Sequence, residues 1–209
     1  MIITVSGKPC TGKSTMAEIF CKKYNFDRVY AGAIFKAHAR ELGIDITDLC
    51  KSEQMCEIDK RVDKDLEKLY HARLNDDLLV ESRTSWSFMP KAFNVFINIP
   101  DMVMAERLFN SDRPEKERGK DLNEALTKVT ERYNADVSRY KMLYNIDCDN
   151  LDNYTFVIDN SNLTPEQTAD KIYEEYIKFI NKMFSDFITA KTAGDTTCYT
   201  SYITTDNCT

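Results

Sequence analysis

The stretch "TVSGKPCTGKSTMAEIF" at residues 4–20 decides the fold of this chain. The apolar run at 1–5 is suitable for a buried strand, and apolar residues recur at helical spacing from 15 to 24. Between them, Gly7 to Ser14 fits the pattern G-x-x-x-x-G-K-S, which is typical of phosphate-binding loops. The loop lies between a strand and a helix, as this chemistry requires.

The glycine, lysine and serine of this pattern each suit the binding of phosphate or of its metal ion. Glycines let the backbone approach a phosphate group closely, and a helix that begins near Lys13 directs its unpaired N–H groups at the same phosphates. Lys13 supplies a charge for the outer phosphates, and the Ser14 hydroxyl can join the shell of a Mg²⁺ ion. The alternative is a glycine turn beside a surface lysine, but the pattern arises by chance in only roughly one chain of this length in a hundred.

The composition predicts a soluble globular domain. The chain has 209 residues, 43% hydrophobic and 30% charged, without a long apolar run or an export signal, so we expect a cytoplasmic protein. The sequence does not give the oligomeric state, and a monomer is taken as the starting expectation. The net charge of -6 argues against a protein that coats nucleic acid or an anionic membrane, but it allows a small basic pocket. The seven cysteines form no C-x-x-C pair, which favours free thiols.

Strand-like and helix-like segments alternate along the chain, which predicts an α/β fold with a central parallel sheet flanked by helices. Strands are expected at 1–5, 28–30, 77–82, 94–99 and 154–159, and helices at 15–24, 31–42, 101–109, 122–144 and from 165 onward, with a mostly helical segment at 45–76. Capping patterns begin two of these helices, with Asp121 and Glu124 at one and Thr164, Pro165 and Gln167 at the other. Residues 110–121 are expected to form a loop, and 186–209 a polar, peripheral tail without helical period.

Three classes of nucleotide-binding protein compete: a kinase for a small acceptor, a GTPase-like switch or regulatory ATPase, and a nucleic-acid enzyme. A guanine-reading N-K-x-D is absent, since "NKMF" at 181–184 lacks the Asp, and no D-x-x-G occurs. The acidic balance weighs against a nucleic-acid enzyme. A small-molecule kinase remains, and it needs cations to neutralise the charge of phosphoryl transfer.

Arginines supply these cations, because a planar guanidinium binds phosphate oxygens in pairs. Five lie in or near the polar loop: Arg107, Arg113, Arg118, Arg132 and Arg139. Arg132, Asp136 and Arg139 share one face of the helix expected at 122–144. A solvated face with an internal ion pair explains the same pattern equally well.

Several motifs together resemble the cytidylate kinases of the compact, archaeal type, within the P-loop nucleoside monophosphate kinases. The similar segments are "MIITVSGKPCTGKST" at the start, "YAGAIFKAHARELG" (30–43), "EIDKRVDKDL" (57–66), "LLVESR" (78–83), "RYNADVSRY" (132–140), "LYNID" (143–147) and "VIDNS" (157–161). The resemblance implies an adenylate-kinase-like core within a single domain at 1–185. It also implies a monophosphate-binding insertion at 31–76 and a lid at 110–120.

The activity implied by the resemblance is transfer of the γ-phosphoryl group from ATP, with Mg²⁺, to CMP or dCMP. The ATP side is assigned to Gly7, Lys8, Pro9, Cys10, Thr11, Gly12, Lys13, Ser14, Thr15 and Arg107, with Ser14 as the metal ligand. The acceptor side is assigned to Gly32, Lys36, Arg83 and Asp136, and the catalytic role to Lys13, Arg113, Arg132 and Arg139. We expect no nucleic-acid partner and no membrane partner.

Some positions depart from the family or stay open. Cys10 stands where the family usually has glycine, and Lys36 where it commonly has arginine. Another acceptor, such as AMP, UMP or a non-nucleotide metabolite, remains an alternative, as does a nucleotide-binding regulator that has lost transfer. Further candidates are weaker: His38 and His71 read as structural or surface residues, Trp86 as an acceptor-pocket or core residue, and Asp59 and Asp63 as residues that share a helix face.

Overall fold

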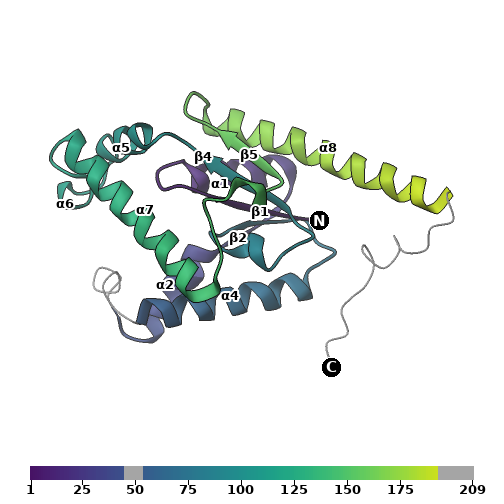
Figure 1. Cartoon of the computed structure of the whole chain (residues 1–209), viewed down its shortest axis with the longest axis horizontal. Helices are drawn as coiled ribbons and strands as arrows, with labels where there is room; N and C mark the ends of the chain where they lie inside the picture. Colours follow the sequence, from purple (N-terminus) through teal and green to yellow (C-terminus); the bar gives the residue numbers. More distant parts are fainter. Residues whose placement is uncertain (45–53, 193–209) are drawn as a thin grey trace. The chain divides into compact units, whose positions relative to one another are not determined.

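The computed structural model describes residues 1–44 and 54–192, and its centre is a five-stranded parallel sheet (Figure 1). The strand order is β2-β3-β1-β4-β5. The strands are β1 (Ile2–Gly7), β2 (Asp27–Tyr30), β3 (Leu78–Glu81), β4 (Phe93–Asn98) and β5 (Phe156–Asp159). The predicted parallel sheet is therefore confirmed, with each strand within two residues of its expected start.

Burial explains which strands occupy the centre. Every residue of β1 and β3 is buried, and so are all but the last residue of β4, whereas the edge strands β2 and β5 are partly exposed. Strands covered on both faces by helices need such continuous burial. The two polar side chains inside β1 are satisfied, since Thr4 donates to Asn94 Oδ1 (2.7 Å) and Ser6 donates to the carbonyl of Ser82 (2.7 Å).

The strand order places a ligand crevice at the end of β1. From β1 the chain crosses to β2 and β3 on one side, and then to β4 and β5 on the other side. In an open parallel sheet, a binding crevice forms outside the carboxyl ends of the strands where the order reverses. The phosphate-binding loop follows β1 directly, so the loop lies at this expected crevice.

Helices cover the sheet and extend beyond it. They are α1 (Lys13–Tyr24), α2 (Ala31–Glu41), α4 (Gln54–Ala72), α5 (Asp101–Phe109), α6 (Glu115–Arg118), α7 (Leu122–Tyr144) and α8 (Pro165–Thr192), with 3-10 turns η1 (Ser85–Ser87) and η2 (Leu151–Asn153). In Figure 1, α7 runs from α5 and α6 at one end toward α2 and α4 at the other. One apolar cluster joins α2 and α4 to β2 and β3, and another joins α5 to α7.

The two predicted capping patterns are confirmed. At α7, Asp121 accepts from the N–H of Glu124 (2.8 Å), and Glu124 in turn accepts from the N–H of Lys120 (3.1 Å). At α8 the exchange is reciprocal, because Thr164 and Gln167 each accept from the other's backbone N–H. These local signals fix where both helices begin.

Two segments differ from the prediction. The expected loop at 110–121 contains the turn α6, in which Arg118 donates to the carbonyl of Phe109 (3.1 Å). The helix α8 continues to Thr192, although the sequence was expected to lose helical period near 186. No glycine or proline interrupts residues 166–193, so nothing in the backbone stops the helix there. Residues 45–53, expected to be mostly helical, lie outside the described residues.

The chain divides into two compact units, Met1–Asp170 and Lys171–Thr209. The first unit contains the sheet and every predicted site residue. The single domain predicted at 1–185 stays a prediction. Across the described residues, no helix has the length and apolar character that a bilayer crossing requires.

The close packing of Gly7 against β4 generates a stability prediction. Gly7 has φ 141°, and a Cβ atom there would lie 2.3 Å from the carbonyl oxygen of Ile97. Gly7→Ala should therefore lower the free energy of unfolding by about 3 kcal/mol, through a backbone clash and a strained φ. Gly43→Ala is the matched control, because Gly43 also has a positive φ (68°) but no atom within 4 Å of the added carbon. Chemical denaturation of both variants checks this, and equal losses would contradict it.

Candidate active site

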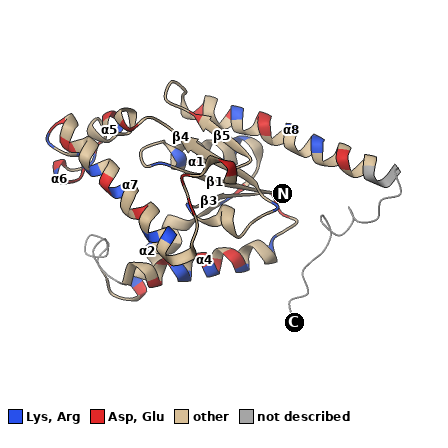
Figure 2. Cartoon of the chain, viewed as in Figure 1, with Lys and Arg blue, Asp and Glu red and all other residues tan. Residues whose placement is uncertain are grey.

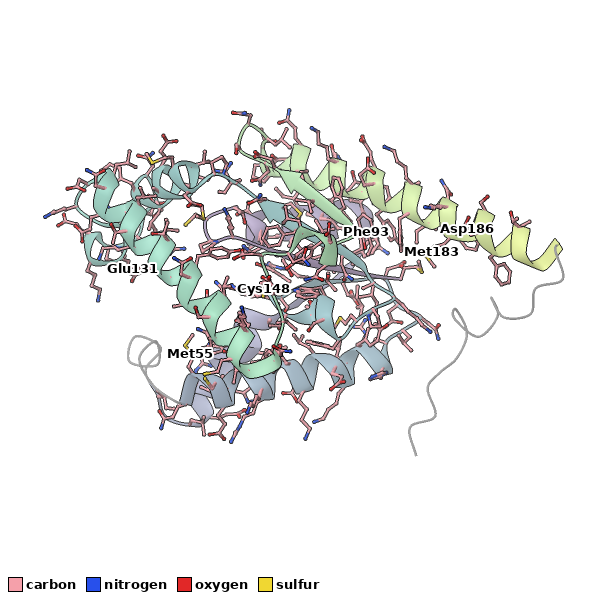
Figure 3. All side chains as sticks on the ribbon, viewed as in Figure 1. Met55, Phe93, Glu131, Cys148, Met183 and Asp186 are labelled. Carbon is pink, nitrogen blue, oxygen red and sulfur yellow. The ribbon has the colours of Figure 1, made fainter. Side chains whose placement is uncertain are left out.

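A cavity of about 730 Å³ opens beside the phosphate-binding loop, at the carboxyl ends of β1 and β3. Most predicted site residues line it: Pro9, Cys10, Thr11, Gly12, Lys13, Ser14, Thr15, Gly32, Lys36, Arg83, Arg107, Arg113, Arg132 and Arg139. Side chains from α2, α4 and α7 complete its wall. Met55 is one of them and is labelled near the start of α4 in Figure 3.

The backbone of the loop is shaped to present N–H groups. Cys10, with φ 57°, and Gly12, with φ 76°, both adopt left-handed conformations. No side chain among the described residues caps the N-terminus of α1, so its first N–H groups stay available to a ligand. Cys10 therefore adopts the left-handed conformation that a glycine would adopt without strain.

The Lys13 ammonium lies inside the curve of the loop. It donates to the carbonyls of Gly7 (2.9 Å) and Lys8 and to the Thr11 hydroxyl (3.1 Å). Burial and the neighbouring Arg83 lower the pKa of Lys13 from 10.5 to about 7. Because this environment disfavours the charged form of Lys13, an anionic ligand beside the amine would stabilise the ammonium.

Glu81 lines the cavity beside the loop, although it was not predicted from the sequence as a site residue. It ends β3, is only 5% exposed, and accepts from the Ser14 hydroxyl (2.5 Å) and from the Arg28 guanidinium (2.6 Å). The carboxylate thus lies beside the hydroxyl predicted to hold Mg²⁺. Its position at a strand end adjacent to β1 could have identified it, since phosphate-binding-loop proteins commonly hold Mg²⁺ with such a carboxylate.

Asn160 is a second missed residue. It is buried after β5, and its side-chain amide donates to the carbonyl of Thr11 in the loop (2.8 Å). Arg107 donates to the side chain of Asn160 (3.2 Å) and to its carbonyl (2.8 Å). Asn160 therefore fixes both the loop and Arg107. The segment "VIDNS" was noted in the sequence, but no local signal connects it to a loop 149 residues earlier.

An ion-pair network connects three elements on the opposite side of the cavity. Arg83, which follows β3, pairs with Asp136 (2.5 Å). Arg139 pairs with Asp136 (2.8 Å) and with Asp59 on α4 (2.7 Å). Burial raises the pKa of Asp59, and Arg139 opposes that rise. Asp136 and Arg139 of the predicted α7 face thus belong to a largely buried network, whereas Arg132 on the same face is exposed.

Three of the assigned residues do not line the large cavity: Gly7, Lys8 and Asp136. The Lys8 ammonium pairs with Asp101 (3.1 Å) and lies over the ring of Tyr133. Asp136 is 5% exposed and borders a much smaller void together with Arg83 and Cys148. Direct contact of Lys8 and Asp136 with ligand stays a prediction.

The weaker candidates are also placed. His38 binds Asp65 (2.9 Å), and neither His38 nor His71 lines the cavity. Trp86 packs against Tyr154 and donates to the carbonyl of Arg83 (3.1 Å), so it supports that segment from outside the cavity. Asp59 and Asp63 both line the cavity.

The cavity is strongly basic in an acidic protein. Blue (Lys, Arg) and red (Asp, Glu) positions are interspersed along the ribbons of the outer helices in Figure 2. The cavity instead gathers seven cations, Lys13, Lys36, Arg83, Arg107, Arg113, Arg132 and Arg139, against three carboxylates, Asp59, Asp63 and Glu81. Among residues 1–44 and 54–192, no group of three or more His, Cys, Asp or Glu could hold a metal ion. A metal there would need ligands from a bound polyphosphate, which is how Mg²⁺ is usually held beside nucleotides.

Comparison with known proteins agrees with this geometry. A family model described as an AAA domain matches residues 3–129. A cytidylate kinase from Methanocaldococcus jannaschii is 35% identical over 166 residues, 77% of this chain and 89% of the relative. A cytidylate kinase from Pyrococcus abyssi is 33% identical over 184 residues, 84% of this chain and 97% of the relative.

Solved structures share the fold at much lower identity. A shikimate kinase from Bacteroides thetaiotaomicron has a TM-score of 0.59 at 12% identity and covers 87% of this chain and 98% of its own. A gluconokinase from Sinorhizobium meliloti has a TM-score of 0.55 at 14% identity and covers 88% and 95%. These likenesses support the P-loop kinase architecture alone.

The lowered pKa of Lys13 predicts that binding of ATP takes up a proton. At pH 8 a lysine with a pKa near 7 is mostly neutral, and adjacent phosphates raise its pKa and protonate it. Calorimetric titrations at pH 8 in two buffers of different ionisation enthalpy should show uptake of close to one proton per site. At pH 6 the uptake should fall toward zero, because Lys13 is then already charged.

Lys13→Arg provides the control, since a guanidinium stays protonated at both pH values. The variant should show no buffer dependence at pH 8. A wild-type binding enthalpy that is the same in both buffers at pH 8 would contradict the prediction.

Proposed function

Because this chain belongs to the cytidylate kinase family of P-loop nucleoside monophosphate kinases, we propose that it transfers the γ-phosphoryl group of ATP to CMP or dCMP. The observation that carries the proposal is the basic cavity, which joins a phosphate-binding loop to a second group of cations around Arg83. A kinase with an anionic acceptor needs both groups. A protein that only binds a nucleotide needs only the first.

The donor side rests on the loop and on Arg107. The N–H groups of the loop and of α1 would bind the β- and γ-phosphates of ATP, with Lys13 between them. Binding would draw the Lys13 ammonium away from the carbonyls of Gly7 and Lys8 toward phosphate oxygens. Arg107, held by Asn160 beside the loop, would contact the bound ATP.

Mg²⁺ fits the oxygen donors at Ser14 and Glu81. The two groups touch at 2.5 Å, and hydroxyl and carboxylate oxygens are ligands that Mg²⁺ prefers. When bound there with ATP, the ion would neutralise phosphate charge and orient the γ-phosphoryl group. Arg28 holds the second oxygen of Glu81 (2.6 Å) and so keeps this carboxylate directed at Ser14.

The acceptor side rests on Arg83 and Lys36, which would bind the phosphate of the monophosphate. Asp136 holds Arg83 in place, and any contact of Asp136 with the sugar would follow a rearrangement of this pair. Apolar side chains of Phe35, Met55 and Val62 line the same region and would contact the flat base.

Transfer then needs positioning rather than a strong base. An oxygen of the acceptor phosphate is already a nucleophile, so it forms the new bond to the γ-phosphorus while the bond to the β,γ-bridging oxygen breaks and ADP leaves. Lys13, Arg113, Arg132 and Arg139 would stabilise the charge that develops between the two anions. We expect no covalent enzyme intermediate.

The donor assignment predicts protection of Cys10. This thiol lines the cavity within the loop, so bound Mg-ATP should cover it and slow its alkylation at least tenfold. Cys56, on α4 and also half-buried, does not line the cavity and is the internal control. Peptide mass spectrometry after timed treatment with iodoacetamide measures both rates. An unchanged Cys10 rate at saturating Mg-ATP would exclude the nucleotide from the loop.

The acceptor assignment is tested by coupled release of ADP with CMP, dCMP, UMP, AMP and GMP. CMP and dCMP should be the best substrates. Arg83→Lys keeps a charge opposite Asp136 but loses the paired guanidinium contacts, so kcat/KM should fall about tenfold for every acceptor alike. Arg61→Lys, on the exposed face of α4, should leave it unchanged.

Two outcomes would overturn the proposal. In the first, AMP proves the best acceptor. In the second, no monophosphate raises turnover above the background with ATP alone, which would favour a nucleotide-binding regulator.

A further inference from the structure

One carboxylate in the cavity has no counter-ion in the part of the chain that the structure describes. Glu81 pairs with Arg28, and Asp59 pairs with Arg139. Asp63 also lines the cavity, but no lysine, arginine or histidine of the described segments forms an ion pair with it. Its hydrogen-bond partner is the neutral hydroxyl of Thr84, at 2.6 Å.

This environment is unfavourable for a charged group. Burial raises the pKa of Asp63, and the hydrogen bond from the Thr84 hydroxyl opposes the rise only in part. A half-buried carboxylate without a cation costs free energy unless a ligand compensates for it. None of the seven cations of the cavity forms an ion pair with this carboxylate.

The negative charge of Asp63 argues against a phosphate as its direct ligand, because two negative charges repel each other. It lies on α4, next to Thr84, and Thr84 directly follows Arg83. Val62 and Met55 of the same helix line the cavity beside it, and so does Phe35 of α2. A planar ring bound against these apolar side chains would present its polar edge to the carboxylate.

We propose that Asp63 is a specificity-determining residue that accepts a hydrogen bond from the exocyclic amino group of the acceptor's base. A carboxylate only accepts hydrogen bonds, so it matches the 4-amino donor of cytosine and opposes the 4-oxo acceptor of uracil. This inference rests on the proposed function, since it requires a nucleoside monophosphate whose phosphate is held by Arg83. Thr84 acts as a positioning residue that holds the carboxylate toward the base.

The test measures the ratio of kcat/KM for CMP to kcat/KM for UMP. Wild-type protein should favour CMP by at least tenfold, the value of one charged hydrogen bond. Asp63→Asn supplies an amide that can accept from cytosine or donate to uracil, so the ratio should fall at least tenfold, with KM for ATP unchanged. Asp65→Asn is the matched control, because Asp65 lies two residues further on α4, binds His38 and does not line the cavity.

A second measurement needs no variant and so does not depend on the folding of Asp63→Asn. The monophosphate of the pyrimidin-2-one ribonucleoside lacks the 4-amino group but keeps the rest of CMP. Wild-type protein should use it at least tenfold less efficiently than CMP. Equal use of the two compounds would overturn the proposal.

Failure of this inference differs from failure of the proposed function. If CMP is phosphorylated but the ratio is the same in wild type and Asp63→Asn, Asp63 does not read the base, and the kinase assignment stands. If the wild-type protein phosphorylates neither CMP nor UMP, the proposed function itself is wrong, and this inference with it.

Discussion

Repulsion among seven cations in one cavity is the constraint on which the site depends. Without counter-ions, these side chains would repel one another and extend into solvent, so they would not be held in position for a phosphate. Buried carboxylates prevent this, since Asp136 and Asp59 hold Arg83 and Arg139 in fixed positions. Removal of one carboxylate from such a buried ion pair typically lowers the stability by about 3–5 kcal/mol, because the charge of the arginine is left buried and unpaired.

The same pairs join elements that are far apart in the sequence. Asp59 belongs to α4, Arg139 and Asp136 to α7, and Arg83 to the segment after β3. In the proposed assignment, a phosphate that binds Arg83 would compete with Asp136 for the guanidinium, so acceptor binding would change the restraint on α7. The donor side has a separate anchor, because Asn160 connects Arg107 to the loop. In the proposed assignment, donor and acceptor would thus be held by two separate sets of polar contacts.

Local signals in the sequence predicted the scaffold well. Five strands, the loop between Gly7 and Ser14, and the capping residues Asp121 and Thr164 are each specified by neighbours within a few positions. The continuation of α8 to Thr192 was missed, because the absence of a helix breaker matters more there than the lost apolar period. The residues of the loop were predicted for the same reason as the strands, since their spacing itself is the signal.

Partners distant in sequence could not be predicted in this way. Asp136 was assigned to the acceptor because of its motif, yet its carboxylate pairs with two arginines, and one of them, Arg83, lies far earlier in the chain. Glu81 and Asn160 acquire their roles only when β1, β3 and β5 come together in the sheet. A sequence can therefore indicate which charged groups converge. Only the folded chain shows which of them neutralise one another, and that Asp63 has no charged partner among the described residues.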